Sequence, residues 1–181
     1  SVNPQHRGLG VGRPLWLFRR DALLARLKPG ATIGMDGVVA MQPFYTKGGF
    51  SIAFRDERYG RQGGRFDVSS NISPIQEDDM PVGLSYDEQC FGFQRPGFMG
   101  PWLAQAGAKS FKFAHKGIVQ GFAVIRKAMV GYKIGPLFAD TPIVAKELYK
   151  ACLNAANGDY VTIDIPVVNT GAIALVKEFD A

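Results

Sequence analysis

Arg7-Gly8-Leu9-Gly10-Val11-Gly12 is a glycine-rich turn directly before a segment with helical periodicity. The apolar residues of that segment recur three or four positions apart, as Val11, Leu15, Phe18, Ala22 and Ala25. Glycine allows positive φ and the close approach of a ligand. The first amides of a helix lack intrahelical acceptors and lie at the positive end of its dipole. The stretch therefore predicts a phosphate site at the start of a helix.

Prolines mark both ends of this helix. Pro14 falls in the first turn, where a missing N–H costs little, and Pro29-Gly30 stops the helix. Other phosphate-binding motifs do not fit, because no Lys-Ser/Thr pair follows as in a P-loop and the glycines are not spaced as G-x-G-x-x-G. The alternative is a glycine-rich turn that binds nothing.

A second motif lies further along the chain. The apolar segment 31–35 predicts a short strand, and it is followed by Met41-Gln42-Pro43-Phe44-Tyr45-Thr46-Lys47-Gly48-Gly49-Phe50. Pro43 favours a short helix that starts near Gln42. Taken alone, Tyr45 is typical of an amphipathic residue with its ring in the core and its hydroxyl at the rim.

Together, the two motifs resemble the GNAT N-acetyltransferase superfamily. The first is similar to its pyrophosphate loop, in which Arg or Gln is followed, after two residues, by Gly-x-Gly/Ala; here these positions are Arg7, Gly10 and Gly12. The second is similar to a short helix that carries Tyr, three residues and Gly-Phe, which correspond to Tyr45 and Gly49-Phe50. The family's Asn and Ala before the tyrosine are replaced by Val38 and Met41.

This resemblance implies an α/β fold, a GNAT-like mixed sheet with flanking helices, and an enzyme that moves an acetyl group from acetyl-coenzyme A to a small-molecule or peptide amine. The residues implied to bind the coenzyme are Val2, Arg7, Gly8, Leu9, Gly10, Val11, Gly12 and Arg13. Tyr45 is the implied general acid, which protonates the departing thiolate. A strand amide is implied to polarise the thioester carbonyl, and no metal is implied.

Two other classes of function remain open. A non-catalytic sensor of coenzyme A or a small metabolite would keep the loop without turnover, and a structural interaction module would bind no phosphate compound. No residue stands out as the general base, because neither His6 nor His115 has a visible partner. The acceptor amine is not identified by any motif.

The stretches Gly131–Asp140 and Ile163–Pro166 resemble the divergent C-terminal domain of tandem bacterial GNAT proteins. This resemblance implies the C-terminal half of one GNAT domain at 1–59 and a divergent GNAT-like domain at 86–181. The Gly/Ser/Asp/Glu-rich segment 60–85 between them is expected to be a linker. The family's earlier strands are missing before the loop, so we expect a fragment of a longer protein. In 1–59, a last strand is expected at 51–58. In 86–181, the patterns predict a helix that begins at Pro96, strands at 109–115, 118–127, 132–137 and 160–165, and helices from Thr141 and Asn169.

The second domain is not expected to bind coenzyme A, because Phe138-Ala139-Asp140-Thr141-Pro142 has no glycine and Asp140 would repel pyrophosphate. Asn169 is expected to be a helix cap. Candidate residues for an acceptor cleft are Asp87, Arg95, Trp102, Tyr132, Lys133 and Asp164, with structural ion pairing and packing as the alternative.

The composition agrees with a cytoplasmic protein. The 181 residues are 46% hydrophobic, and no apolar run approaches the ~20 residues that span a bilayer. Cys90 and Cys152 lack metal-ligand spacing and are expected to be buried free thiols.

The formal net charge of +5 raises the question of nucleic acid, since Arg55, Arg58, Arg61 and Arg65 lie close together. Acidic residues are interleaved with these arginines and no recognition motif accompanies them, so the sequence does not predict a nucleic-acid partner. A positive field also suits the phosphates of coenzyme A. The expected strand at 31–35 would leave an open edge, which predicts either packing onto the second domain or a homodimer.

Overall fold

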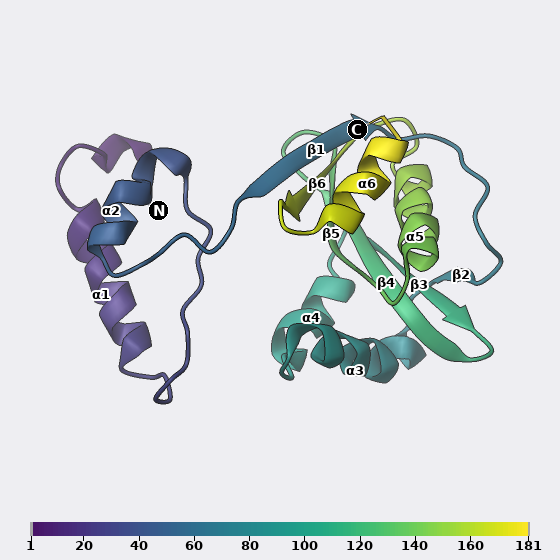
Figure 1. Ribbon diagram of the computed structural model, residues 1–181, viewed down its shortest axis with the longest axis horizontal. Helices are drawn as coiled ribbons and strands as arrows, with labels where there is room; N and C mark the ends of the chain where they lie inside the picture. Colours follow the sequence, from purple (N-terminus) through teal and green to yellow (C-terminus); the bar gives the residue numbers. More distant parts are fainter. Residues whose placement is uncertain (1, 181) are drawn as a thin grey trace. The chain divides into compact units, whose positions relative to one another are not determined.

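The computed structural model describes residues 2–180 and divides into two compact units, Ser1–Ala53 and Phe54–Ala181 (Figure 1). Unit 2 contains a six-stranded mixed sheet with helices on both faces. Its strands are β1 (Asp56–Gln62), β2 (Ile72–Pro74), β3 (Lys109–His115), β4 (Ile118–Lys127), β5 (Tyr132–Ala139) and β6 (Tyr160–Pro166), in the order β1-β6-β5-β4-β3-β2. The expected α/β fold class is confirmed.

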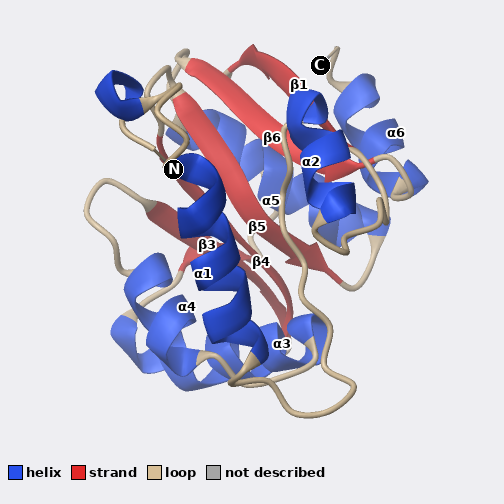
Figure 2. Cartoon of the chain, turned by 90° about the vertical axis from the view of Figure 1, so that its left-hand side faces the viewer, coloured by secondary structure: helices blue, strands red, loops and turns tan. Residues whose placement is uncertain are grey.

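The helices of unit 2 form two layers. They are the short 3-10 helix η3 (Glu77–Asp79) and the α-helices α3 (Met80–Phe91), α4 (Pro96–Leu103), α5 (Pro142–Ala155) and α6 (Thr170–Glu178). Helix α5 packs across β3, β4 and β5 and contacts α6, whereas α3 packs on β4 and α4 (Figures 1 and 2).

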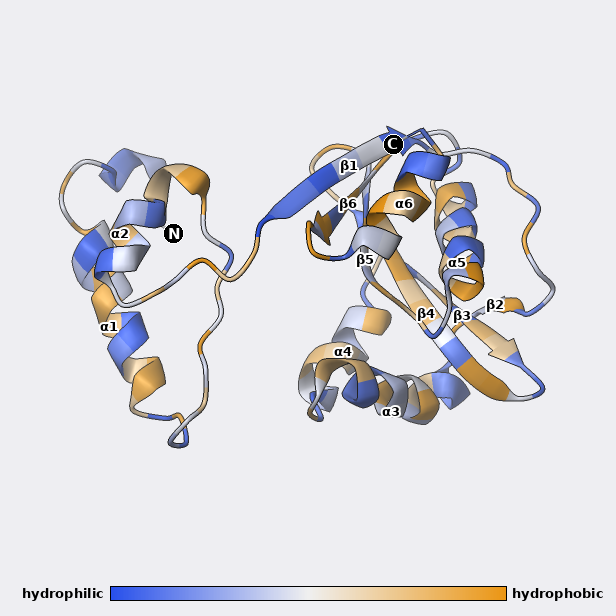
Figure 3. Ribbon diagram, in the orientation of Figure 1, coloured by the Kyte–Doolittle hydropathy of each residue, from blue (hydrophilic) through white to orange (hydrophobic). Residues whose placement is uncertain are grey.

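Strand β4 is buried on both faces of the sheet. Phe122 and Val124 enter a core with residues of α3 and α4, while Ala123 and Ile125 enter the core beneath α5 and α6. Side chains of a strand alternate between faces, so a strand covered on both sides must be apolar at consecutive positions. Figure 3 shows this continuous apolar character along much of β4, in contrast to the polar first half of β1.

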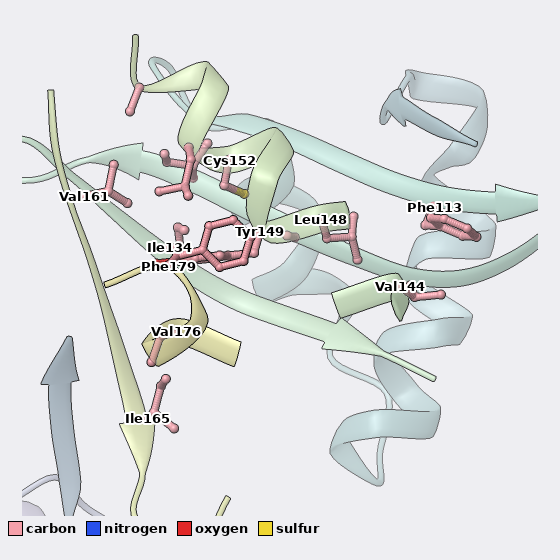
Figure 4. Packing of buried hydrophobic residues seen from close by; sticks show 14 residues of the cluster. Phe113, Ile134, Val144, Leu148, Tyr149, Cys152, Val161, Ile165, Val176 and Phe179 are labelled. Carbon is pink, nitrogen blue, oxygen red and sulfur yellow. The ribbon is translucent and has the colours of Figure 1, made fainter. Parts of the chain in front are cut away.

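Helix α5 supplies the centre of the larger core. The Thr141 hydroxyl caps its start by accepting a hydrogen bond from the Val144 amide at 3.3 Å. Leu148, Tyr149 and Cys152 are fully buried and meet side chains of β5, β6 and α6 (Figure 4).

Strands β5 and β6 are the only parallel pair formed within residues 2–180, and their ladder is short. It runs from Tyr132 opposite Val161 to Ile134 opposite Ile163, after which the strands part. Where the ladder ends, the Gly135 carbonyl accepts a hydrogen bond from the Trp102 indole at 3.0 Å. A side chain of α4 thus satisfies a backbone group that β6 leaves free.

Unit 1 has a different character. Its elements are η1 (Pro4–His6), α1 (Gly12–Leu24), η2 (Val39–Met41) and α2 (Gln42–Lys47). None of its described residues is buried. The helix predicted to begin near Gln42 is confirmed, and the helix after the glycine-rich turn ends at Leu24, before Pro29-Gly30.

Two expected strands are wrong as stated. Residues 31–35 form no strand, so the open edge from which a homodimer was predicted does not exist at that position. The strand expected at 51–58 is instead Asp56–Gln62, which belongs to unit 2 and pairs antiparallel with β6. Its pairing partner is distant in sequence, which a local pattern does not reveal.

The expected linker at 60–85 is ordered structure. It contains the end of β1, all of β2 and the first half of α3. The Asn154 side chain on α5 both donates to and accepts from the Phe66 backbone, at 2.8 and 2.7 Å. The Phe66 ring packs edge-on against Phe179, with the ring centroids 5.4 Å apart. Few apolar residues are needed here, because side chains of α5 bind the segment's backbone.

The remaining sequence patterns of unit 2 predicted its elements correctly. The helix expected to begin at Pro96 is α4, the strands expected from 109 to 165 are β3 to β6, and the helices expected from Thr141 and Asn169 are α5 and α6. Asn169 caps α6, since its side chain accepts from the Ala172 amide at 3.0 Å.

Three charged side chains from neighbouring strands meet on one face of the sheet. The Arg58 guanidinium binds Asp164 through two hydrogen bonds of 2.7 and 2.9 Å, and Lys133 pairs with the same carboxylate at 2.5 Å. The hydrogen bond from Arg58 is the main reason why the pKa of Asp164 falls to about 2, with Lys133 adding to the effect against partial burial.

We expect Asp164→Asn to destabilise the protein by about 1 to 2 kcal/mol at pH 7, because it removes a carboxylate held by two cations. The folded-state pKa lies below the ordinary value, so this stabilisation is complete above about pH 4 and disappears as the pH falls towards about 2. Urea unfolding at several pH values measures the difference. The control is Asp56→Asn, because Asp56 is exposed on β1 and forms no ion pair among the described residues. If Asp164→Asn lowered the free energy of unfolding equally at pH 2 and pH 7, the assignment would be contradicted.

Candidate active site

The glycine-rich turn of unit 1 has a backbone conformation that suits glycine and leaves its surface free of side chains. Helix η1 is capped by Asn3, whose side chain accepts from the Gln5 amide at 3.2 Å. Beyond it, Gly8 and Gly10 have φ of +80° and +77°, values that L side chains rarely adopt, and a Cβ at either position would meet no atom within 4 Å. The turn therefore presents bare backbone to open space.

Helix α1 begins directly after this turn and is not capped by a side chain. Val11 stands at the N-cap without a side-chain hydrogen bond, so the Gly12 and Arg13 amides have no acceptor within the helix. Pro14 carries no amide hydrogen. Two N–H groups thus remain at the positive end of the dipole, where an anion is stabilised.

The charge of the chain is concentrated around this site. Residues 2–53 hold seven Lys and Arg against two Asp, which equals the net charge of +5 of the whole chain. Unit 2 is therefore neutral by the same count. Arg7 is anchored through its Nε, which donates to the Val2 carbonyl at 3.4 Å. A positive field around a turn with free amides favours a phosphorylated ligand.

One hollow of about 1220 Å³ in unit 1 brings the two sequence motifs together. Of the predicted site residues, it is lined by Val2, Arg7, Gly8, Gly10, Val11, Gly12, Arg13 and Tyr45. Leu9 does not line it and is 69% exposed. Apart from Leu9, the predicted loop residues and the predicted general acid share one cavity.

The sequence patterns did not reveal the aromatic cluster that surrounds Tyr45. Trp16 of α1 lies 5.1 Å from Phe44, 6.1 Å from Tyr45 and 6.0 Å from Phe50, measured between ring centroids. The available signal was the four-residue spacing of Trp16 and Arg20, which places both on one face of a helix. Arg20 lies over the Trp16 ring at 5.3 Å.

In unit 2, the candidate cleft residues that make contacts serve the fold. Asp87 is buried and receives two hydrogen bonds of 2.7 Å from Arg95. Trp102 binds the Gly135 carbonyl, and Lys133 and Asp164 form the ion-pair group described above. Their polar groups are engaged by other protein groups, as the structural alternative predicts.

The start of α5, where a second phosphate site would lie, is capped by a side chain and flanked by a carboxylate. Asp140 accepts a hydrogen bond of 2.5 Å from the Tyr86 hydroxyl, and burial together with this carboxylate raises the pKa of Tyr86. Thr141 caps the first turn. The first turn of α5 is thus already capped by a side chain, and Asp140 directly before Thr141 adds a negative charge that disfavours an anion.

The arginines considered for nucleic acid do not form one patch. Arg58 binds Asp164, whereas Arg61 donates to the Phe179 carbonyl and lies over the Phe66 ring at 5.4 Å. Odd and even positions of a strand face opposite sides, so these two side chains lie on different faces of β1.

Cys152 is buried, and burial raises the pKa of its thiol; Cys90 is exposed, so its expected burial is wrong.

No group of three or more His, Cys, Asp or Glu within residues 2–180 is arranged to hold a metal ion. None of the helices in the described part of the chain combines the length and apolar character needed to cross a bilayer.

Comparison with known proteins points to one family. The profile of the acetyltransferase (GNAT) domain matches residues 84–181, which lie in unit 2 and not at the glycine-rich turn. The chain is 28% identical over 179 residues to holothin acyltransferase of Pseudoalteromonas sp. (strain SANK 73390), covering 98% of this chain and 59% of that protein.

Solved structures agree with this result. A putative acetyltransferase from Pyrococcus horikoshii has a TM-score of 0.75 and 25% identity, covering 99% of this chain and 58% of that one. A GCN5-related N-acetyltransferase from Anabaena variabilis shares the fold, with a TM-score of 0.60, 14% identity and coverage of 96% and 48%. The chain thus spans less than two thirds of the length of each of these relatives.

We expect Gly10→Asp to weaken coenzyme A binding at least tenfold more than Gly10→Asn does, measured by isothermal titration of the full-length protein. Asn and Asp have the same shape and both tolerate positive φ, so the pair isolates the charge placed beside a phosphate. Asp140→Gly in unit 2 is the control and should leave the affinity unchanged. Equal affinities of the Gly10→Asp and Gly10→Asn proteins would remove the turn from the binding site.

Proposed function

The chain belongs to the acetyltransferase (GNAT) family, and we propose that it transfers an acetyl group from acetyl-coenzyme A to an amine, using a donor site in unit 1. The observation that carries this proposal is the shared hollow. The amides at the start of α1 and the Tyr45 ring line the same cavity, although they come from segments about thirty residues apart. A turn that only reversed the chain would not require this arrangement.

The residues of unit 1 suit the phosphates of coenzyme A. The Gly12 and Arg13 amides are free donors, and Gly8 and Gly10 leave room for close approach because a Cβ at either would point into open space. Arg7 lines the same cavity and adds a positive charge to it. We propose that these groups hold the pyrophosphate, since backbone donors and a guanidinium bind phosphate oxygens without a metal.

Bound acetyl-coenzyme A supplies an acetyl group activated as a thioester. The amine nitrogen of the acceptor attacks the acetyl carbon and releases one proton to solvent water. The carbon–sulfur bond breaks, and its electron pair leaves with sulfur. Tyr45 lines the cavity in which a proton is required at this moment, and we assign its hydroxyl as the donor to the departing thiolate. The Tyr45 phenolate then takes a proton back from solvent water, and the products are the acetylated amine and the free thiol.

One part of the family's chemistry has no counterpart in the described part of unit 1. The resemblance implied that a strand amide polarises the thioester carbonyl, but residues 31–35 form no strand. We therefore assign no residue of this chain to that role. We also assign no general base. The Tyr45 hydroxyl is the proton donor, and no second titratable side chain that lines the cavity makes a contact that would identify it as a base.

The acceptor is proposed only as a class, an amine. Because one relative is named holothin acyltransferase, we include holothin among the acceptors of the substrate panel. A cation-rich unit 1 selects for the phosphorylated donor and does not identify the acceptor.

The proposal is tested by incubating the full-length protein with acetyl-coenzyme A and an amine, and by measuring the released thiol with a chromogenic disulfide reagent. We expect release that depends on an amine from a panel of polyamines, amino acids, peptides and holothin, with mass spectrometry showing the acetylated product. Tight binding of coenzyme A without amine-dependent release across the panel would support a sensor instead.

We expect Tyr45→Phe to lower kcat by roughly ten- to several-hundredfold while the affinity for coenzyme A changes little, because the ring's packing is kept and the proton donor is lost. The loss should shrink with a thioester whose thiol is more acidic, since such a thiolate needs less protonation. Steady-state kinetics with a short series of thioesters measures both effects. A variant that works at the full rate would make Tyr45 a packing residue.

A further inference from the structure

Trp16 joins the two helices of the proposed donor site. Its indole meets three aromatic rings that belong to α2 or follow it directly, those of Phe44, Tyr45 and Phe50. Trp16 and Arg20 are half-buried and lie one turn apart on α1, whereas Phe18 and Arg19 between them are exposed. The face of α1 that carries Trp16 is therefore the face turned to α2.

The indole also rests directly on the backbone of α2. Gly48 ends this helix, and a Cβ at Gly48 would lie 2.0 Å from Trp16 Cη2 and 2.7 Å from Cζ3. Real Cβ atoms are not found at such distances, so the ring occupies the space that any other residue at this position would need. Trp16 and Gly48 thus form a tight contact between α1 and the end of the helix that carries Tyr45.

Arg20 contacts both partners, Trp16 and Gly48. Its Nη1 donates to the Gly48 carbonyl at 3.3 Å, and its guanidinium carbon lies 5.3 Å from the centre of the Trp16 ring. Asp21 binds Nε at 2.8 Å and Nη2 at 2.7 Å. Each nitrogen of the guanidinium therefore has a protein partner, which distinguishes Arg20 from a residue free to bind phosphate.

The other side of Tyr45 is also fixed by backbone. A Cβ at Gly37 would lie 3.1 Å from both Cδ2 and Cε2 of the tyrosine ring. The Tyr45 hydroxyl forms no hydrogen bond with any residue from 2 to 180. Packing alone places this ring, and Trp16 is the largest side chain in that packing.

We propose that Trp16, braced by Arg20, is a positioning residue that sets the place of the Tyr45 hydroxyl by its contact with Gly48. This inference rests on the proposed role of Tyr45 as the proton donor. Tyr45 and Gly48 are three residues apart, on consecutive positions of one helical face, so a shift at Gly48 moves the hydroxyl with it. A shift of about 1 Å in a reacting group can cost a hundredfold in rate.

Gly48→Ala in the full-length protein is the test, because the added methyl group must push the indole and α2 apart. We expect kcat to fall by about ten- to a hundredfold with the KM for acetyl-coenzyme A unchanged. The rate should also depend more steeply on the acidity of the leaving thiol, as in Tyr45→Phe. Gly97→Ala, on α4 with no atom within 4 Å of the new Cβ, is the matched control and should keep the parent rate.

A second variant keeps the test informative if the first is unstable. Phenylalanine lacks the far ring of the indole, which holds Cη2, Cζ3 and Cζ2, the atoms that a Cβ at Gly48 would meet. Trp16→Phe combined with Gly48→Ala should therefore restore both folding and most of kcat relative to Gly48→Ala alone. Circular dichroism and the thermal midpoint report folding independently of activity.

The outcomes separate this inference from the proposed function. A Tyr45→Phe protein with the full rate would overturn the proton-donor role. A slow Tyr45→Phe protein together with a folded Gly48→Ala protein of parent rate and parent leaving-group dependence would overturn only the positioning role. A rise in KM for acetyl-coenzyme A without a fall in kcat would place Trp16 and Gly48 in coenzyme binding and would also overturn it.

Discussion

The burial of β4 on both faces is the constraint on which unit 2 depends. Phe122 and Val124 are enclosed on one side, Ala123 and Ile125 on the other, and each of the two cores needs its own helical layer. This requirement fixes the roles of the other elements. Helix α5 must return over the sheet and connects β5 to β6 in parallel, and α3 and α4 must cover the opposite face.

The proposed chemistry belongs to unit 1, which differs from unit 2 in burial and in net charge. Unit 1 has no buried residue among those described, yet it holds the whole net charge of the chain and the free amides at the start of α1. In unit 2, a comparable helix start is capped by Thr141 and has Asp140 beside it. The same element, the beginning of a helix, is thus suited to an anion in one unit and closed to it in the other.

Sequence patterns predicted what depends on local chemistry. The periodicity of α5, the caps at Thr141 and Asn169 and the open glycine turn all follow from residues within one or two turns of each other. Strand β1 was misplaced because its pairing with β6 joins Arg58 to Asp164 across most of the second unit. Local composition does not reveal the order of residues 60–85, because that order comes from α5 side chains such as Asn154 rather than from the segment's own apolar residues. The contact of Trp16 with Gly48 was invisible for the same reason, since it depends on how two helices pack.

The central claim is that the glycine turn of unit 1, and not the start of α5, binds the coenzyme. Hydrogen–deuterium exchange of the full-length protein with and without coenzyme A tests it most directly, because the proposed ligand groups are themselves exchanging amides. The account predicts slower exchange at residues 8–13 when coenzyme A is present, with no change at 139–144. Protection at 139–144 with none at 8–13 would contradict it.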